Sequence, residues 1–574
     1  MAELYRFLRL LICNIPQNLR LILTTRNSLP FAAELGAKGL LHRVGTETLA
    51  FRQEDIPAYC RMMGIVVTAE QAGELYSYSE GWISALYLFL RDYQQTGRFA
   101  FSSSIPELMD KTVYQPLTAE EKSFLLAVCL FDSFSMREAA AVWPHANAAE
   151  SAEGLLSANA FLTRDGETGI LSLHNLLRQC VRERFELLTE PEWRAAWRKT
   201  GEALFQGGKT MRALACFENA GDWGGVLRVI ADSGHARDLY PEHKALYIRC
   251  YLACPAEKKR DYPLAALAFG MDMLTQFYEP ALYRQAEADF CTAMAENTAL
   301  SDDERRQLSG EHALLLSFSK FNDLFEMGAQ NARAAALLCR PPRFVYTEDS
   351  FTFASPPLLY LYHREAGGLA RLADYMNTAP GSYTKSTGGH GHDFMPMLCA
   401  ERLYFMGDAE NARIAAYQST ELARAAEQGD LVLCGLFLLA RLALQSGNVD
   451  ELRVLRGEIY RLSRRLSREH GAYWLLYTGD LCLAWLDLCA GNSDSLPDWL
   501  FMRDYPKYLP FVTISCADIV LGRALLKKAK MRVCWASPTR FYSRRKSFRI
   551  CWLFFIFAFI RRRPATGCIG TKRR

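Results

Sequence analysis

Residues 161–185 read FLTRDGETGILSLHNLLRQCVRERF, and this segment decides the fold of the middle of the chain. Two short apolar runs, 161–163 and 170–173, flank the turn signal Asp165-Gly166-Glu167, so they predict a β-hairpin. The part that follows, as far as Phe185, has apolar residues at helical spacing. Three more helices are predicted before the hairpin, at 118–130, 136–143 and 150–159. Three helices followed by a two-stranded hairpin describe a winged helix.

The chain before this block predicts a strand and then helices. Residues 19–25, LRLILTT, form a short apolar run between polar turn residues, which is typical of a buried parallel strand. Residues 52–63 and 68–90 have apolar positions three and four apart, with Gly64 as a break between two predicted helices.

The chain after the winged helix predicts a helical repeat array. From Glu192 onward, helices of ordinary length end in Gly-Asp, Gly-Asn or Pro. Gly407-Asp408, Gly447-Asn448 and Gly491-Asn492 recur at spacings of 40 and 44 residues, and Gly221-Asp222 closes an earlier pair. A turn that recurs between helix pairs indicates an α-solenoid. Several prolines and a glycine-rich stretch make residues 340–400 an irregular junction between repeats.

Composition favours a folded cytoplasmic protein. Half of the residues are apolar and 23% are charged, which is ordinary for globular domains. The first residues read as an amphipathic helix rather than a secretion signal. The 17 cysteines are scattered through helical stretches, as expected of reduced core residues. Residues 1–526 carry 52 basic and 63 acidic side chains, a net charge of −11, which does not suit a phosphate-binding nucleic-acid surface.

The last 44 residues differ from the rest. Residues 531–574 contain no acidic residue, and 15 of the 67 Lys and Arg lie at or after Lys527. The apolar run 550–560 has eleven residues, too few to span a bilayer, which takes about 20. The abrupt loss of helical periodicity favours a shift of reading frame over a membrane or nucleic-acid tail, and a membrane partner is not the leading expectation.

Four motifs in order resemble one bacterial family. They are residues 16–26 (PQNLRLILTTR), 39–41 with 49–55 (GLL and LAFRQED), 80–82 (EGW) and 173–178 (LHNLLR). Together they resemble the large ATP-binding regulators of the LuxR type, the MalT-like group within the class of signal-transduction ATPases with numerous domains (STAND). The resemblance covers residues 5–530.

The resemblance implies a mainly α protein with a remnant of an α/β nucleotide-binding domain (1–30), a helical domain (31–105), a winged helix (106–190) and a tetratricopeptide-like sensor (191–530). A basic and apolar tail (531–574) follows, for which the composition favours a shift of reading frame. The resemblance also implies that ATP or ADP acts as a switch, that an inducer or a regulatory protein binds the repeats, that the protein self-associates, and that an intact member binds DNA.

The same resemblance assigns nucleotide contacts. Arg26, at the end of the predicted strand, takes the place of a phosphate sensor, and a guanidinium suits phosphate oxygens. His174 resembles the winged-helix histidine that approaches the diphosphate. Gly81 and Trp82 fall where the family has Gly-Trp-Pro near the adenine, but Ile83 replaces the proline. The alternatives are a solvated arginine, a satisfied core histidine and a core tryptophan.

Two functional segments of the family are not found. No Gly-x-x-x-x-Gly-Lys-Ser/Thr loop is present to wrap phosphates, and residues 531–574 do not have the pattern of a DNA-binding helix-turn-helix. We therefore expect a fragment that lacks both, is not an enzyme, has no catalytic residues and binds no cofactor by itself.

A ligand pocket in the repeats is a further prediction. Polar and aromatic residues suited to it are Tyr360, His363, Arg364, His390 and His392. The Gly-His-Gly-His-Asp sequence at 389–393 could suggest a metal, but its glycines favour a tight loop and no further ligands complete a tetrahedral site, so no metal is predicted. The leading hypothesis is a truncated regulator; the alternative is a stand-alone repeat adaptor whose tail associates with membranes.

Overall fold

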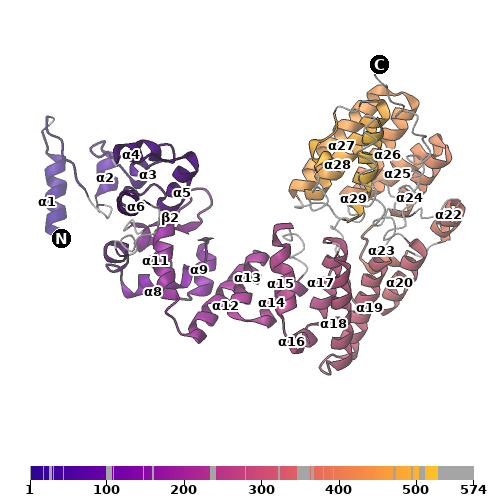
Figure 1. The fold of residues 1–574 in the computed structure, drawn as a ribbon, viewed down its shortest axis with the longest axis horizontal. Coiled ribbons are helices and arrows are strands. Elements are labelled where there is room, and N and C mark those ends of the chain that lie inside the picture. Colours follow the sequence, from indigo (N-terminus) through magenta and orange to yellow (C-terminus); the bar gives the residue numbers. More distant parts are fainter. Residues whose placement is uncertain are drawn as a thin grey trace, which may run out of the picture. The chain divides into compact units, whose positions relative to one another are not determined.

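The computed structural model describes two units, residues 1–222 and 223–574. Within them it describes residues 2–527 except 17, 25–28, 30, 43, 98–106, 108, 146–147, 158–160, 233–240, 278, 321–322, 346–361, 363–367, 379–380, 392–393, 470–472, 493–494 and 503–510. The described chain is mainly α, as predicted, and its only sheet has three short strands (Figure 1).

The first unit contains the helical segment and the winged helix. Its elements are α1 (Ala2–Cys13), α2 (Ala32–Ala37), α3 (Thr46–Leu49), α4 (Ile56–Met62), α5 (Ala69–Ser79), α6 (Ile83–Thr96), the π-helix η1 (Asp110–Tyr114), α8 (Ala119–Val128), β1 (Ser133–Phe134), α9 (Met136–Val142), α10 (Ala148–Ser157), β2 (Leu162–Arg164), β3 (Leu171–Leu173), α11 (Asn175–Phe185), α12 (Glu190–Gln206) and α13 (Thr210–Ala220).

The predicted winged-helix elements are all present. Strands β2 and β3 pair antiparallel, with Leu162 opposite Leu173, and α8, α9 and α10 precede them. Helices α8 and α9 each begin with a capping box, at Thr118 and Ser135, which fixes their starts. Strand β1 pairs with the other edge of β3 and was not predicted, since two residues are too short to show alternation.

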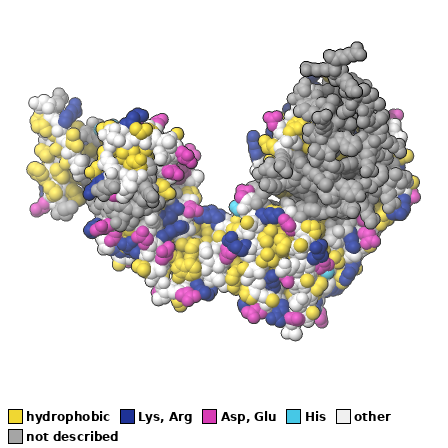
Figure 2. All heavy atoms as spheres, in the orientation of Figure 1, with side chains coloured by type: hydrophobic (Ala, Val, Ile, Leu, Met, Phe, Trp, Pro, Cys, Tyr) yellow, Lys and Arg dark blue, Asp and Glu magenta, His cyan; other side chains and the backbone are white. Residues whose placement is uncertain are grey.

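The predicted buried strand at 19–25 is wrong for the described residues 19–24, which form no strand. Leu19 is 53% exposed and Ile22 is 87% exposed. A strand needs a neighbour for its backbone hydrogen bonds, and the described sheet lies elsewhere. Helix α1 packs Tyr5 and Leu8 against α2 but leaves other apolar side chains in solvent, and hydrophobic side chains gather on this helix in Figure 2.

The predicted helix at 68–90 is two helices. Helix α5 starts at a capping box on Thr68 and ends at Glu80, which has a left-handed backbone with φ of 46°. Gly81 follows with φ of 80°, and α6 starts after Trp82. The two consecutive positive φ values reverse the direction of the chain between α5 and α6. The apolar residues of both helices follow the same three- and four-residue spacing, so this spacing alone does not reveal where one helix ends and the next begins.

The second unit is a helical repeat array. Its elements are α14 (Trp223–Ala231), η3 (Pro241–His243), α15 (Lys244–Ala253), α16 (Ala256–Asp261), α17 (Pro263–Thr275), α18 (Pro280–Glu296), α19 (Asp302–Ser319), α20 (Leu324–Leu337), α22 (Leu369–Thr378), α23 (Ser382–Ser386), α24 (Phe394–Met406), α25 (Ala409–Ala425), α26 (Gly429–Ser446), α27 (Val449–Glu469), α28 (Tyr473–Ala490), η4 (Asp498–Phe501) and α29 (Phe511–Lys527).

Helices α24 to α28 pack in chain order, each against the next. Helix α26 also contacts both α24 and α28, so these three helices form one layer. Helix α25 packs against α24 and α26 of this layer, and α27 packs against α26 and α28. Helix α26 is long and apolar enough to cross a membrane, but 78% of it is buried inside the unit, as in a core helix.

The recurring glycine turns have one geometry. At Gly447, φ is 73°; its N–H donates to Leu444 O at 3.3 Å, and the N–H of Asn448 donates to Ala443 O at 2.9 Å. This pair of bonds is a Schellman motif, which satisfies the last carbonyls of a helix. The same two bonds occur at Gly221, Gly407 and Gly491. The turns predicted from the sequence are therefore confirmed as helix stops.

We expect Gly447→Ala to lower the free energy of unfolding of the repeat unit by about 1 kcal/mol, because a side chain at positive φ is strained. A steric clash is not the cause, since no atom lies within 4 Å of a Cβ added at Gly447. Urea denaturation followed by circular dichroism measures the change. Gly457→Ala in the middle of α27 is the control, and it should stabilise the unit by about 1 kcal/mol. Equal changes in the free energy of unfolding for the two substitutions would contradict the role of Gly447 as a helix stop that requires positive φ.

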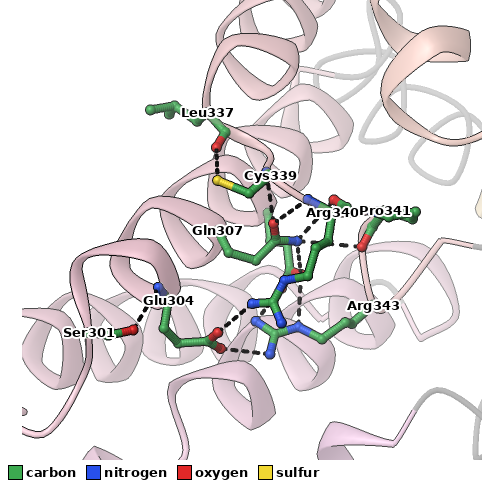
Figure 3. A network of polar contacts seen from close by, with 9 residues as sticks. Ser301, Glu304, Gln307, Leu337, Cys339, Arg340, Pro341 and Arg343 are labelled. Atoms are coloured by element: carbon green, nitrogen blue, oxygen red, sulfur yellow. Dashed lines mark hydrogen bonds and ion pairs between the residues drawn. The ribbon is translucent and has the colours of Figure 1, made fainter.

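A buried polar network holds the segment after α20 against α19 (Figure 3). The side chain of Glu311 is fully buried and accepts hydrogen bonds from Arg343 Nε at 2.9 Å and Gln307 Nε2 at 2.9 Å. Gln307 Oε1 accepts the backbone N–H groups of Cys339 and Arg340, both at 3.0 Å. The junction predicted to be irregular from residue 340 is thus tied down at its start.

Glu304, at the beginning of α19, extends this network. Its carboxylate accepts from Arg340 Nη2 and Arg343 Nη1, both at 2.7 Å. Burial acts to raise the pKa of Glu304, but hydrogen bonds from Arg343 and Arg340 outweigh it, and the pKa is lowered. Both carboxylates of the network therefore face guanidinium groups (Figure 3).

Candidate functional site

The candidate site is the junction between the end of α5 and the start of α11. Helix α5 ends with backbone carbonyls that lack partners within the helix, as every α-helix does. Asn175 Nδ2 donates to Ser77 O at 3.0 Å, and His174 Nε2 lies 3.1 Å from Ser79 O. The winged helix therefore caps a helix of the preceding domain.

The contacts of His174 identify its tautomer. Its Nδ1 accepts the N–H of Leu176 at 3.2 Å, so Nδ1 carries no proton. Because Ser79 O can only accept, Nε2 carries the proton and donates it. The neutral imidazole thus uses both ring nitrogens inside the protein, and its side chain is only 12% exposed.

Charges at the junction surround this neutral ring. Glu80 Oε2 lies 3.8 Å from His174 Nε2, and Glu80 Oε1 accepts the N–H of Asn175 at 3.1 Å. The pKa of His174 is lowered chiefly by burial and also by the nearby Arg178, although Glu80 and the Ser79 carbonyl act to raise it. Burial outweighs the carboxylate, so the junction favours neutral His174.

Strained backbone lies at the same place. Three described residues other than glycine have positive φ, and two of them, Glu80 at 46° and Phe161 at 58°, belong to this junction. A bulky residue such as Phe161 is rarely found there. Its ring makes edge contacts with both Trp82 and His174, with centroids 5.0 Å away in each case. Strain of this kind persists where surrounding structure enforces it, and it clusters at switch regions.

Gly81 has a tight steric role. Its carbonyl accepts the N–H of Phe51 at 2.9 Å, and a Cβ added to it would lie 2.1 Å from Phe51 O. Only glycine fits both this contact and φ of 80°. Trp82, which precedes α6, is half-buried against Phe161. The structure thus brings together His174, Gly81 and Trp82, three of the residues predicted from the sequence.

Of the other predicted site residues, the structure describes only His390. Arg26, Tyr360, His363, Arg364 and His392 lie outside the described residues. His390 is described; it is 3% exposed and its Nδ1 lies 2.6 Å from Tyr383 Oη. This histidine is therefore buried within the second unit rather than presented on its surface.

Sequence reasoning placed Glu80 in the motif at 80–82 and Phe161 in the predicted hairpin, but it gave a site role to neither of them, nor to Ser79. Ser79 contributes a backbone carbonyl, which any residue would supply. Glu80 and Phe161 matter because of their positive φ, which residue types that favour right-handed backbone do not reveal. The sequence offered two signals, the EGW motif at 80–82, which contains Glu80, and the LHNLLR motif at 173–178, in which Asn175 follows His174 directly.

Comparison with known families addresses the winged-helix block first. The family described as the MalT winged helix domain matches residues 110–194. The chain is related to the MalT-type regulators. The resemblance predicted from the sequence is thus confirmed, and the junction described above lies partly inside the matched domain.

Curated relatives agree with this assignment. The MalT-like chain is 27% identical over 187 residues to the HTH-type transcriptional regulator MalT of Vibrio campbellii, covering 30% of the chain and 21% of that protein. It is 23% identical over 245 residues to MalT of Vibrio parahaemolyticus, covering 40% of the chain and 27% of that protein. MalT of Vibrio cholerae is 26% identical over 189 residues, which are 31% of the chain and 21% of that protein. The matches thus span only about a quarter of these relatives.

One solved structure is also similar in part. It is a signal transduction ATPase with numerous domains, carrying a tetratricopeptide repeat sensor, from Pyrococcus horikoshii. The identity is 15% and the TM-score 0.34, over 88% of the MalT-like chain and 76% of that chain. A TM-score this low does not assign a fold.

The titration of His174 gives a pH prediction. Above pH 6.5 the neutral ring is stable both in the junction and when released. As pH falls below 6.5, the released state takes up a proton but the junction, where the pKa is lower, does not. Docking therefore weakens by at most about 1.4 kcal/mol per pH unit until the pKa of the docked ring is reached.

Hydrogen exchange of residues 69–79 and 173–185, normalised to the chemical exchange rate at each pH, measures this weakening. Wild type should lose protection between pH 7.5 and 5.5. His174→Gln, which keeps an N–H donor but does not titrate, should lose none beyond the general change. Identical pH profiles for the two proteins would rule out His174 as the titrating group.

Proposed function

We propose that this chain is the hinge and sensor part of a MalT-like transcriptional regulator. In this proposal the repeats bind an inducer or a regulatory protein, and the junction at His174 holds the winged helix against the helical segment in one of two states. The observation that carries it is the capping of α5 by His174 and Asn175 beside two strained residues, because such a contact is either fully made or broken.

In this proposal, His174 is the residue that links nucleotide binding to the junction. Both ring nitrogens are engaged in the docked junction, so a nucleotide phosphate could meet this imidazole only after the bond to Ser79 O is released. Docking and contact with phosphate would then be alternative states of one side chain. ATP or ADP, self-association, DNA binding and a cytoplasmic location belong to the proposed whole regulator rather than to these residues alone.

Sequencing the coding DNA on both sides of codons 1 and 574, read in all three frames, tests this function. We expect a Gly-x-x-x-x-Gly-Lys-Ser/Thr loop upstream and a helix-turn-helix downstream, since the regulator requires both. Absence of both from every frame would overturn the proposal in favour of a repeat adaptor. Whether residues 531–574 are out of frame is read from the same data.

The switch role of the junction has its own experiment. His174→Ala with Asn175→Ala removes both side-chain caps from α5, so residues 76–80 should lose hydrogen-exchange protection while residues 119–128 keep it. Asn411→Ala, which removes an exposed side-chain contact in α25, is the control and should change neither region. Retained protection at 76–80 in the double variant would show that the caps do not hold the junction.

A further inference from the structure

Two arginines in the repeat unit, Arg441 and Arg523, lie against aromatic rings and form no ion pair with a described residue. Two arginines on the side of α25 and α27 are paired with carboxylates: Arg424 Nη2 lies 3.0 Å from Glu458 Oε1, and Arg456 Nη1 lies 2.9 Å from Asp487 Oδ1. In the layer of α24, α26 and α28, Arg441 forms no hydrogen bond or ion pair with any described residue.

Arg441 is 5% exposed, and its Nε and Nη1 are buried without a hydrogen-bond partner. A buried charge without a partner is costly, so native proteins pair such groups. Three aromatic rings lie against the guanidinium. Its carbon Cζ lies 4.1 Å from the ring centroid of Tyr404, 5.1 Å from that of Phe405 and 5.4 Å from that of Phe437.

The rings continue to a second guanidinium. Phe437 makes a perpendicular contact with Trp485 of α28 at 6.3 Å, and Arg523 of α29 lies over Trp485 at 4.4 Å. Among the described residues Arg523 has no ion pair either. Arginine and aromatic side chains thus alternate across four helices, and we call this set, Tyr404, Phe405, Arg441, Phe437, Trp485 and Arg523, the arginine–aromatic row.

The row reaches the surface at both ends. Tyr404, Phe405 and Arg523 are half-buried, whereas Arg441 between them is buried. Cation–π contacts hold the faces of a guanidinium but leave its in-plane N–H groups unused. Those N–H groups form a fork that matches the two oxygens of a carboxylate or phosphate.

We propose that the arginine–aromatic row binds a small molecule that carries carboxylate or phosphate oxyanions, with Arg441 as its principal donor and Arg523 as the second. The inference rests on the proposed sensing role of the repeats and names the chemical class of the ligand. Residues 1–526 carry a net charge of −11, and within this acidic segment Arg441 is a buried cation without an ion pair to any described residue.

Titration calorimetry of the full chain with two probes, sodium phosphate and sodium succinate, tests the inference, with sodium chloride at matched ionic strength as the blank. We expect saturable heat with at least one probe. Phosphate alone would identify the phosphate class and succinate alone the carboxylate class. No heat above the chloride blank with either probe would overturn the inference.

Substitutions of Arg441 test whether the oxyanion binds at the arginine–aromatic row. Arg441→Met should weaken it by about 10- to 100-fold, the loss expected when a charge-assisted bidentate contact is removed. Arg441→Lys keeps the charge but not the fork, and it should restore part of the affinity. Arg453→Met is the matched control, since Arg453 pairs with Asp450 on the exposed side of α27, and it should bind as wild type does.

Circular dichroism of Arg441→Met checks that the variant is folded; removal of an unpaired buried cation is expected to preserve folding. Equal affinity in wild type and folded Arg441→Met would overturn the inference. Calorimetry needs no flanking sequence or DNA, so failure here would leave the regulator proposal standing. Conversely, absence of the flanking domains would not abolish oxyanion binding.

Discussion

Arg343→Met is expected to lower the free energy of unfolding of the region around α19 by about 3 kcal/mol. Among the described side chains, the substitution leaves the fully buried carboxylate of Glu311 with Gln307 as its remaining partner. An uncompensated buried charge destabilises far more than loss of an exposed ion pair. Loss of Arg343 also removes one of the two guanidinium partners of Glu304.

Hydrogen exchange of residues 302–320 and 338–345 measures this effect locally. Arg453→Met, which breaks an exposed pair with Asp450, is the control and should change stability by less than about 1 kcal/mol. The double substitution Glu311→Met with Arg343→Met removes both charges and should recover most of the loss. If the double variant is as unstable as Arg343→Met alone, buried charge is not the cause.

Gly81→Ala is expected to destabilise the junction by more than about 3 kcal/mol. A side chain at φ of 80° is strained by about 1–2 kcal/mol. The larger part of the destabilisation is steric, because the new Cβ would lie 2.1 Å from Phe51 O, a backbone atom that cannot rotate away. The turn would have to open, moving Ser79 and Trp82 away from His174 and Phe161.

Gly97→Ala separates these two causes. Gly97 ends α6 with φ of 68°, and nothing lies within 4 Å of an added Cβ. This control should cost only about 1 kcal/mol. Urea denaturation gives both values, and hydrogen exchange at residues 69–79 and 173–185 should increase in Gly81→Ala alone. Similar losses in both variants would mean that backbone strain, not the contact with Phe51, fixes the turn.

The sequence predicted local features well and context-dependent ones poorly. The hairpin at 161–173 and the glycine turns depend on neighbouring residues, and both are present. The strand at 19–25 depends on partners that the described residues do not supply, and residues 19–24 are exposed chain. Apolar periodicity crosses the break at Gly81, so one helix was predicted where two exist.

The candidate site was predicted in part for the same reason. His174, Gly81 and Trp82 were named through the family resemblance, and the structure brings them together. Their partners contribute a carbonyl, a left-handed glutamate and a left-handed phenylalanine. None of these properties can be read from a residue type, since a free carbonyl and a positive φ belong to the backbone at the end of α5 and before β2. The nucleotide roles of Arg26 and His174 stay predictions.

The repeated Schellman turns have a consequence for how such a chain can change over evolutionary time. Each turn closes its own helix with two backbone bonds, and helices α24 to α28 pack in chain order. A segment of 40 residues, 408–447, therefore ends in its own stop signal and needs only its neighbours for burial. Duplication or deletion of such a segment would lengthen or shorten the array by one helix pair and leave the turns between the other helices intact.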